Sequence, residues 1–258
     1  MSGHSVNIPH CSASLLKYFK LNIRRSRQLC AASSSDPSVA NIHQLRVALR
    51  RTRTVLTLLK DQGIKTLSTV DSQNLSKLRK TLAKRRDADV AREILSSIGE
   101  DVPHRSEIEA LHTNKLLKRL QKKKNRQLFR NLAKLAKDLK GQAISPEKTI
   151  RKQLEKLSHV YQKPSEVHAF RIVLKNSRYV LEGLGLSVDE FKPYQNVMGE
   201  LNDLETLFFL TDEDPGIKKR RDKKLKEALK VIAPARKLAV KKLTAALTFR
   251  PDNLDPVL

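Results

Sequence analysis

Apolar residues recur every three or four positions along almost the whole chain, with polar residues between them. This spacing places apolar side chains on one face of an α-helix, and no segment shows the alternation that is typical of a β-strand. Glycine and proline stand mostly between the periodic segments and mark their ends. We therefore expect an all-α protein. Helices are predicted over 12–32, 39–60, 72–98, 103–140, 147–162, 165–184, 188–210 and 217–247, the fourth of them very basic and the last kinked at Pro234.

The best boundary inside the chain is the segment 141–146, which Gly141 and Pro146 enclose. It divides the chain into residues 1–143 and 144–258, with four predicted helices in each half. Two motifs recur in the same order in both halves: one contains His43 and His168, and the other contains Asp87 and Asp203. Two matches in the same order are hard to obtain by chance, so the sequence predicts an internal duplication.

The charge balance indicates a polyanionic partner. The 258 residues include 52 Lys and Arg against 27 Asp and Glu, a formal net charge of +25. Nucleic acid, an anionic membrane surface and other polyanions are the usual partners of such proteins. Aromatic residues make up only 4% of the chain and Trp is absent, which disfavours modules that stack RNA bases on aromatic rings.

Other classes of protein are disfavoured by what the sequence lacks. No apolar run approaches the roughly 18 residues that indicate a transmembrane helix, and no secretory signal is visible. We therefore expect a soluble cytoplasmic protein with no membrane partner. The two cysteines, Cys11 and Cys30, are interpreted as ordinary reduced thiols.

The most informative motif is a row of cationic residues that occurs twice. In each copy, a histidine is followed by basic residues three, seven and ten positions later. On a helix the four positions fall within an arc of about 80°, and the opposite face is apolar in both copies, as in a helical bundle. The first stripe is His43, Arg46, Arg50 and Arg53, and the second stripe is His168, Arg171, Lys175 and Arg178.

The residue types of these stripes suit phosphate. A guanidinium group offers planar, two-pronged donors that match phosphate oxygens. Each stripe is about 15 Å long, enough to contact several successive phosphates of a chain. For one stripe alone a solvated basic face is the simpler interpretation, and each histidine could equally have a structural hydrogen-bonding role. The duplication favours a preorganised polyanion site.

An aspartate follows each stripe in the next predicted helix. Asp87 and Asp203 have the wrong sign for anion ligands, so we expect them to pair with motif arginines and hold the guanidinium groups in place; a surface carboxylate is the alternative. Lys84, Arg85 and Arg86 lie directly beside Asp87. At least one of these three is expected to reach the same site, and Lys84 and Arg86 are included in the candidate binding set.

An enzyme is not expected, and neither is a metal or a cofactor. No phosphate-binding loop of the form Gly-x-x-x-x-Gly-Lys-Ser/Thr is present. The close carboxylates of Asp87 and Asp89 would point about 200° apart on a helix, which makes a poor metal clamp. A nucleic-acid-binding basic helical protein is the main alternative, and weak nucleic-acid binding is expected of any site for a phosphate chain. The oligomeric state is left open.

Together the two motifs resemble the CHAD domain, the conserved histidine α-helical domain. The resemblance lies in residues 42–53 and their second copy and in residues 86–90 and 199–203, and it covers nearly the whole chain. It implies an internally duplicated pair of four-helix bundles, with pseudo-two-fold symmetry around a basic central channel. It also implies that the two stripes bind inorganic polyphosphate and that the protein associates with polyphosphate granules.

The chain departs from the pattern at three places. Asn176 stands where the first copy has Arg51, so we expect the second stripe to bind more weakly. Ala83 stands where the second copy has Gly199. Glu182 lies on the extended second stripe, where we expect it to cap the anion path.

Overall fold

A computed structural model describes residues 9–98, 105–159, 161, 163–211 and 213–248. The regular elements of these residues are helices, in agreement with the predicted all-α class. They are α1 (Pro9–Ser35), α2 (Val39–Asp61), α3 (Thr69–Ile98), α4 (Arg105–Leu120), α5 (Lys123–Asp138), α6 (Glu147–Ser158), η1 (Pro164–Glu166), α7 (Val167–Gly183), η2 (Asp189–Phe191), α8 (Lys192–Leu210) and α9 (Pro215–Thr248).

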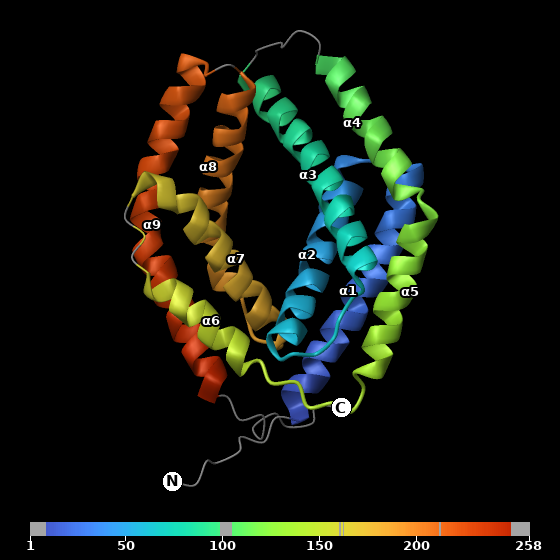
Figure 1. Cartoon of the computed structure of the whole chain (residues 1–258). Coiled ribbons are helices and arrows are strands. Elements are labelled where there is room, and N and C mark those ends of the chain that lie inside the picture. The colour runs from blue at the N-terminus through green and yellow to red at the C-terminus, as the bar shows by residue number, and fades with distance from the viewer. Residues whose placement is uncertain (1–8, 99–104, 160, 162, 212, 249–258) are drawn as a thin grey trace.

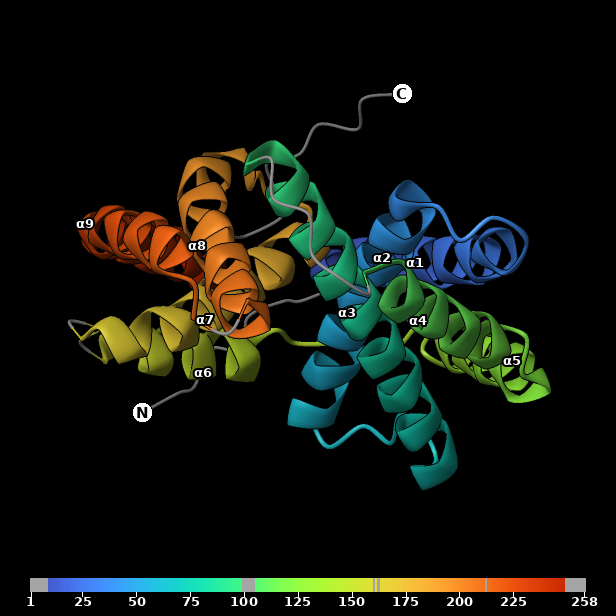
Figure 2. The same cartoon turned by 90° about the horizontal axis from the view of Figure 1, so that it is seen from above.

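The helices form two groups side by side, α1–α5 in one and α6–α9 in the other (Figures 1 and 2). Each group encloses its own large apolar cluster, and a third, smaller cluster joins α3 to α8 and α9. Between the groups, α2 contacts α7 and α3 contacts α8. The two motif helices therefore lie against each other at the centre of the molecule. The internal duplication, the symmetry and the division at residues 143 and 144 stay predictions.

The apolar backs of the motif helices lie in these cores, as the periodicity predicts. On α2, Leu45 and Leu49 are fully buried in the first cluster. On α7, Phe170 and Leu174 are fully buried in the second. Burying one such side chain stabilises the fold by about 1.5–3 kcal/mol. Each motif helix is thereby fixed in rotation, and its cationic stripe cannot turn away.

The single long helix predicted over 103–140 is wrong, because the structure has two helices, α4 and α5, with a break at residues 121 and 122. A buried polar cluster stabilises the break. The Asn125 side chain donates hydrogen bonds to the backbone carbonyls of Arg119 and Leu120, at 2.7 and 2.9 Å. Arg119 in turn donates to the backbone carbonyl of Asn74 on α3, at 2.7 Å. These contacts satisfy the carbonyl groups that the end of α4 leaves free. Within the described residues, the first group therefore has five helices and not four.

The chain breaks that Gly and Pro predict agree with the structure. Gly63 ends α2 with a left-handed backbone angle φ of 77°, a conformation that glycine adopts at little cost. The last helix continues through Pro234, with Ile232 and Ala235 buried on either side of it.

Cys30 is a buried free thiol, whereas the side chain of Cys11 lies outside the described residues. No described helix is long and apolar enough to cross a membrane.

Candidate functional site

The first stripe lines a pocket of about 370 Å³ between α2 and α3. The guanidinium of Arg46 is anchored there, since its Nη1 donates to the backbone carbonyls of Leu82 and Ala83 at 3.4 and 3.3 Å. His43 and Arg53 are exposed at either end of the stripe. The residues that line the pocket are Arg46, Arg50, Arg53, Ser76, Arg79, Lys80, Leu82 and Ala83. Three of the four members of the first stripe thus converge on one pocket.

The second stripe approaches the first across the contact between α7 and α2. Burial, followed by the charges of Arg171 and Arg50, lowers the pKa of Lys175 to about 7. Burial also lowers the pKa of Arg171, and Arg50 adds to that effect from the opposite helix. Arg50 therefore lies within electrostatic reach of both cations of α7. His168, exposed in the first turn of α7, and Arg178 complete the row along the helix.

The pKa of His43 depends on cations from three of the inner helices. Its pKa is lowered by desolvation first, and then by the charges of Arg86 on α3, Arg46 and Arg50 on α2, and Lys175 on α7. A histidine whose pKa falls below its ordinary value is neutral at pH 7, when its ring nitrogens offer one donor and one acceptor. In the ligand-free protein, His43 is therefore a polar group among cations rather than another cation.

A set of contacts between α2 and α7 holds the two stripes together. Arg51 forms an ion pair with Glu182, and each side chain is less than a quarter exposed. Beside it, Arg50 Nη1 donates to the hydroxyl of the buried Tyr179 at 3.2 Å. The guanidinium of Arg178 lies over the Tyr179 ring, 4.7 Å from its centroid, where the ring face attracts a cation. Tyr179 thus supports one arginine from each stripe.

These contacts change two of the expectations from the sequence. Glu182 pairs with Arg51 across the helices, so its role is to join them rather than to cap an anion path. For the same reason Arg51 is engaged with a carboxylate and does not extend the first stripe. Asn176, which replaces Arg51 in the second copy, is then no argument for a weaker second stripe.

The two predicted supporting carboxylates lie within electrostatic reach of the stripes, and their role in holding the guanidinium groups in place stays a prediction. Asp203 favours the charged form of Arg171, Lys175 and Arg46, which come from both stripes. Asp87 favours the charged form of Arg46. These two carboxylates face a larger number of permanent cations, so the site keeps a strong excess of positive charge.

The structure separates the three basic residues next to Asp87. Arg85 is buried and turned towards α4, with its Nε donating to Asp89 at 2.8 Å and its guanidinium bonded to Thr113. The charge of Arg86 lowers the pKa of both His43 and Arg46, so Arg86 lies within electrostatic reach of the first stripe, and its Nη1 also lies 3.8 Å from Glu93. Lys84 is exposed, and its assignment to the binding set stays a prediction.

Sequence reasoning missed two residues of the site. Arg79 lines the pocket of the first stripe, and burial followed by the charges of Arg53, Arg50 and Arg46 lowers its pKa to about 10. Arg79 lies two helical turns before Arg86, a spacing that puts both on one face of α3 and could have identified it. The other is Tyr179, whose aromatic ring takes the position of Thr54 in the first copy.

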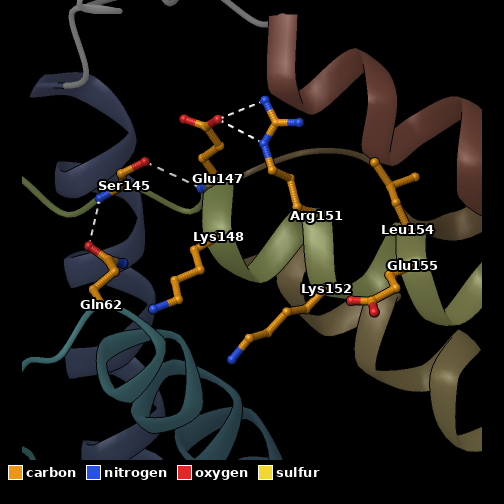
Figure 3. Close-up of a pocket in the computed structure, with 8 residues that line it drawn as sticks. All are labelled: Gln62, Ser145, Glu147, Lys148, Arg151, Lys152, Leu154 and Glu155. Carbon is orange, nitrogen blue, oxygen red and sulfur yellow. Dashed lines mark hydrogen bonds and ion pairs between the residues drawn. The ribbon is translucent and has the colours of Figure 1, made fainter.

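A second pocket lies where the chain passes between the helix groups, away from both stripes (Figure 3). It is lined by acidic and basic side chains in similar numbers. Ser145 donates its backbone N–H to Gln62 at 2.9 Å, and Lys152 forms an ion pair with Asp61 at 2.5 Å. These contacts attach the start of α6 to the end of α2, so the pocket is a structural joint without the excess charge of the stripes.

Comparisons with known proteins agree with this architecture. The model of the CHAD domain family matches residues 23–212 of the chain. The crystal structure of the CHAD domain from the plant Ricinus communis aligns over 97% of this chain and 94% of that one, with a TM-score of 0.61 and 18% sequence identity. At this identity the likeness shows a shared fold. No curated protein matches the chain.

Proposed function

Because the chain belongs to the CHAD domain family, we propose that it binds inorganic polyphosphate along the cationic stripes of α2 and α7. The observation that carries the proposal is the packing of α2 against α7, where Tyr179 contacts Arg50 of the first stripe and Arg178 of the second. The motifs resemble those of the CHAD domain, and this resemblance implies polyphosphate binding, which supports the same proposal. The proposed binding set comprises both stripes, Lys84, Arg86 and Arg79, which lines the pocket of the first stripe.

The electrostatics of the ligand-free site favour a long anion. The cations of two helices are partly removed from water, and the carboxylates that favour their charged forms, Asp87, Asp203 and Glu205, are fewer than the cations. Phosphate oxygens would replace the lost hydration with charge-assisted hydrogen bonds, which are stronger than neutral ones. A chain of phosphates can satisfy successive arginines along about 15 Å of each helix, whereas a single phosphate satisfies only a few.

The biological setting follows from the proposed ligand. A protein that binds polyphosphate without converting it would associate with polyphosphate granules, and this is the localisation we propose. The stripes themselves require neither a metal nor a cofactor to bind a polyanion. That the protein is not an enzyme stays a prediction.

Nucleic acid is the second candidate, since a net charge of +25 attracts any polyanion. Competition separates the two ligands. If the site is built for polyphosphate, long-chain polyphosphate displaces a labelled RNA at far lower phosphate concentration than RNA displaces labelled polyphosphate. The reverse order would assign the site to nucleic acid.

The direct test removes the stripes by replacing Arg46, Arg50, Arg171 and Arg178 with Ala. Arginines bonded to phosphate contribute more than 1 kcal/mol each, so we expect the affinity for long-chain polyphosphate to fall by at least about 100-fold. A matched control replaces four exposed cations of α9, Lys218, Lys219, Arg220 and Lys223, with Ala.

Both variants lose the same formal charge, and circular dichroism checks that both stay helical. We expect the α9 control to keep its affinity within about three-fold, because distant exposed charges contribute mainly through screened, long-range attraction. Equal losses in the two variants would show that binding depends on total charge and not on the stripes.

A further inference from the structure

A long groove runs along the outer side of the first helix group, between α1 and α5 and away from the stripes. Its volume is about 1140 Å³, the largest of the pockets described above. The groove follows α1 from Lys20 to Ser34 and α5 from Asn125 to Lys137. These fourteen steps along α1 correspond to about 21 Å, or four helical turns. Figure 1 shows the two helices side by side and running in opposite directions.

The rim of this groove is strongly cationic. Seven Lys and Arg side chains line it, among them Arg24 and Arg27 on α1 and Arg130 and Lys134 on α5, and no Asp or Glu does. All four of these are exposed. A surface of one sign over this length attracts a partner of the opposite sign and speeds its association.

The floor of the groove is apolar and is recessed below the cationic side chains of the rims. Ile23, Cys30 and Phe129 form its base as part of the first core. Ala31 and Ala133 are exposed beside them, and their short side chains leave space for another backbone to come close. Helices pack at interaxial distances of about 8–10 Å when the side chains at the contact are small.

We propose that this groove docks an acidic amphipathic helix of a partner protein. Such a helix would place apolar residues, spaced three and four apart, on the alanine-lined floor, and its Asp and Glu residues would meet the cations of the two rims. This inference does not depend on the proposed polyphosphate function. A chain of phosphates has no apolar group for the floor, so it would use the rims alone.

A flat anionic membrane fits the groove less well. The apolar floor is recessed between long cationic side chains, so it cannot reach into a bilayer. The large apolar side chains that stand exposed in the described residues, such as Ile172 and Phe209, do not line the groove. The concave shape therefore favours a rod-shaped partner over a surface.

The test uses a designed peptide of about 18 residues, long enough to fill the groove, with Leu on one helical face and Glu on the other. Its binding to the full chain is followed by fluorescence anisotropy. A second peptide of the same composition has its Leu residues scattered around the helix. We expect the amphipathic peptide to bind at least about ten-fold more tightly than the scattered one, because only it can bury its apolar face.

Two variants locate the peptide in the groove. Arg130→Glu with Lys134→Glu reverses two of the four cations that α5 contributes to the groove, and Ala133→Trp fills the floor without changing charge. Both are expected to weaken peptide binding by at least about ten-fold. The matched control, Lys218→Glu with Lys219→Glu on α9, reverses the same charge elsewhere and should change binding by less than about three-fold. All five positions are exposed, so the fold should tolerate the changes.

Several results would overturn the proposal. Equal binding of the two peptides, or an unchanged affinity of the Ala133→Trp variant, would show that only charge is recognised. Loss of peptide binding in the variant that removes Arg46, Arg50, Arg171 and Arg178 would place the peptide at the stripes instead. Binding to phosphatidylserine vesicles that depends on Arg130 and Lys134, in a protein that does not bind the peptide, would assign the groove to membranes. Polyphosphate retention, measured on the same variants, reports separately on the proposed function.

Discussion

The charge state of Lys175 offers the sharpest test of the site. Burial and neighbouring guanidinium groups lower its pKa from 10.5 to about 7. At about 1.4 kcal/mol for each pKa unit, this corresponds to about 5 kcal/mol against the charged form in the ligand-free protein. A polyphosphate chain between the stripes would surround the amine with negative charge and raise its pKa again. Binding above pH 7 would therefore be coupled to the uptake of a proton.

The sign of the pH dependence follows from this shift. Well below pH 7, Lys175 is protonated with and without ligand, so its titration does not affect the affinity. Above pH 7 the free protein loses the proton and binding must restore it. The affinity for polyphosphate should then fall by about five- to ten-fold per pH unit between about pH 7.5 and 9. The lowered pKa of His43 and the terminal phosphate groups lie below this window, so Lys175 is the group of the stripes expected to dominate it.

Lys175→Arg is the matched control, because arginine keeps its charge throughout this range. We expect this variant to bind polyphosphate with little pH dependence above pH 7.5. Isothermal titration in two buffers of different ionisation enthalpy measures the proton uptake directly. Equal pH slopes in the two proteins, or no proton uptake by the wild type at about pH 8, would refute the role given to Lys175.

Three further predictions concern contacts around the site and in the fold. Tyr179→Phe removes the hydroxyl that supports Arg50 but keeps the ring beneath Arg178, so polyphosphate affinity should fall about five-fold, measured by fluorescence titration, with little change in helicity. Asn125→Ala leaves the carbonyl groups at the end of α4 unpaired and should lower the free energy of unfolding in urea by about 1–3 kcal/mol. Glu182→Gln leaves Arg51 without its carboxylate and should lower the same free energy by about 1–3 kcal/mol, whereas Glu147→Gln, which breaks an exposed ion pair with Arg151, should have almost no effect.

The sequence predicts those features that depend on residues close together in the chain. Helical periodicity identifies α2 and α7, since the buried Leu49 and Leu174 and the cationic Arg50 and Lys175 lie on different faces of the same turns. It also predicts that the stripes have fixed directions. Their approach to each other was implied by the family resemblance, because the spacing of residues within a helix says nothing about its neighbour.

Features that depend on contacts far apart in the chain could not be predicted in this way. The break between α4 and α5 rests on Asn125 and on Asn74, which is about fifty positions earlier and on another helix. The pairing of Arg51 with Glu182 spans 131 positions. In the sequence, Glu182 continues the spacing of the second stripe, and only the packing of α7 against α2 reveals that its partner is Arg51. Ala83 and Gly199 occupy corresponding positions in the two copies. A Cβ added at Gly199 would meet nothing within 4 Å, so this position accommodates either residue.

Two cationic stripes that face each other repel, so the ligand-free fold must hold them in place. The apolar backs of α2 and α7, the ion pair between Arg51 and Glu182, and Tyr179 between the stripes provide this restraint. The restraint leads to a second prediction for Glu182→Gln, now on affinity. If the stripes attracted polyphosphate by charge alone, removing a carboxylate would strengthen binding. If the site is preorganised, the variant loosens the contact between α2 and α7, and ordering the cations again costs free energy when polyphosphate binds. We therefore expect weaker polyphosphate binding in a variant with a higher positive charge, and tighter binding would show that total charge outweighs the geometry of the stripes.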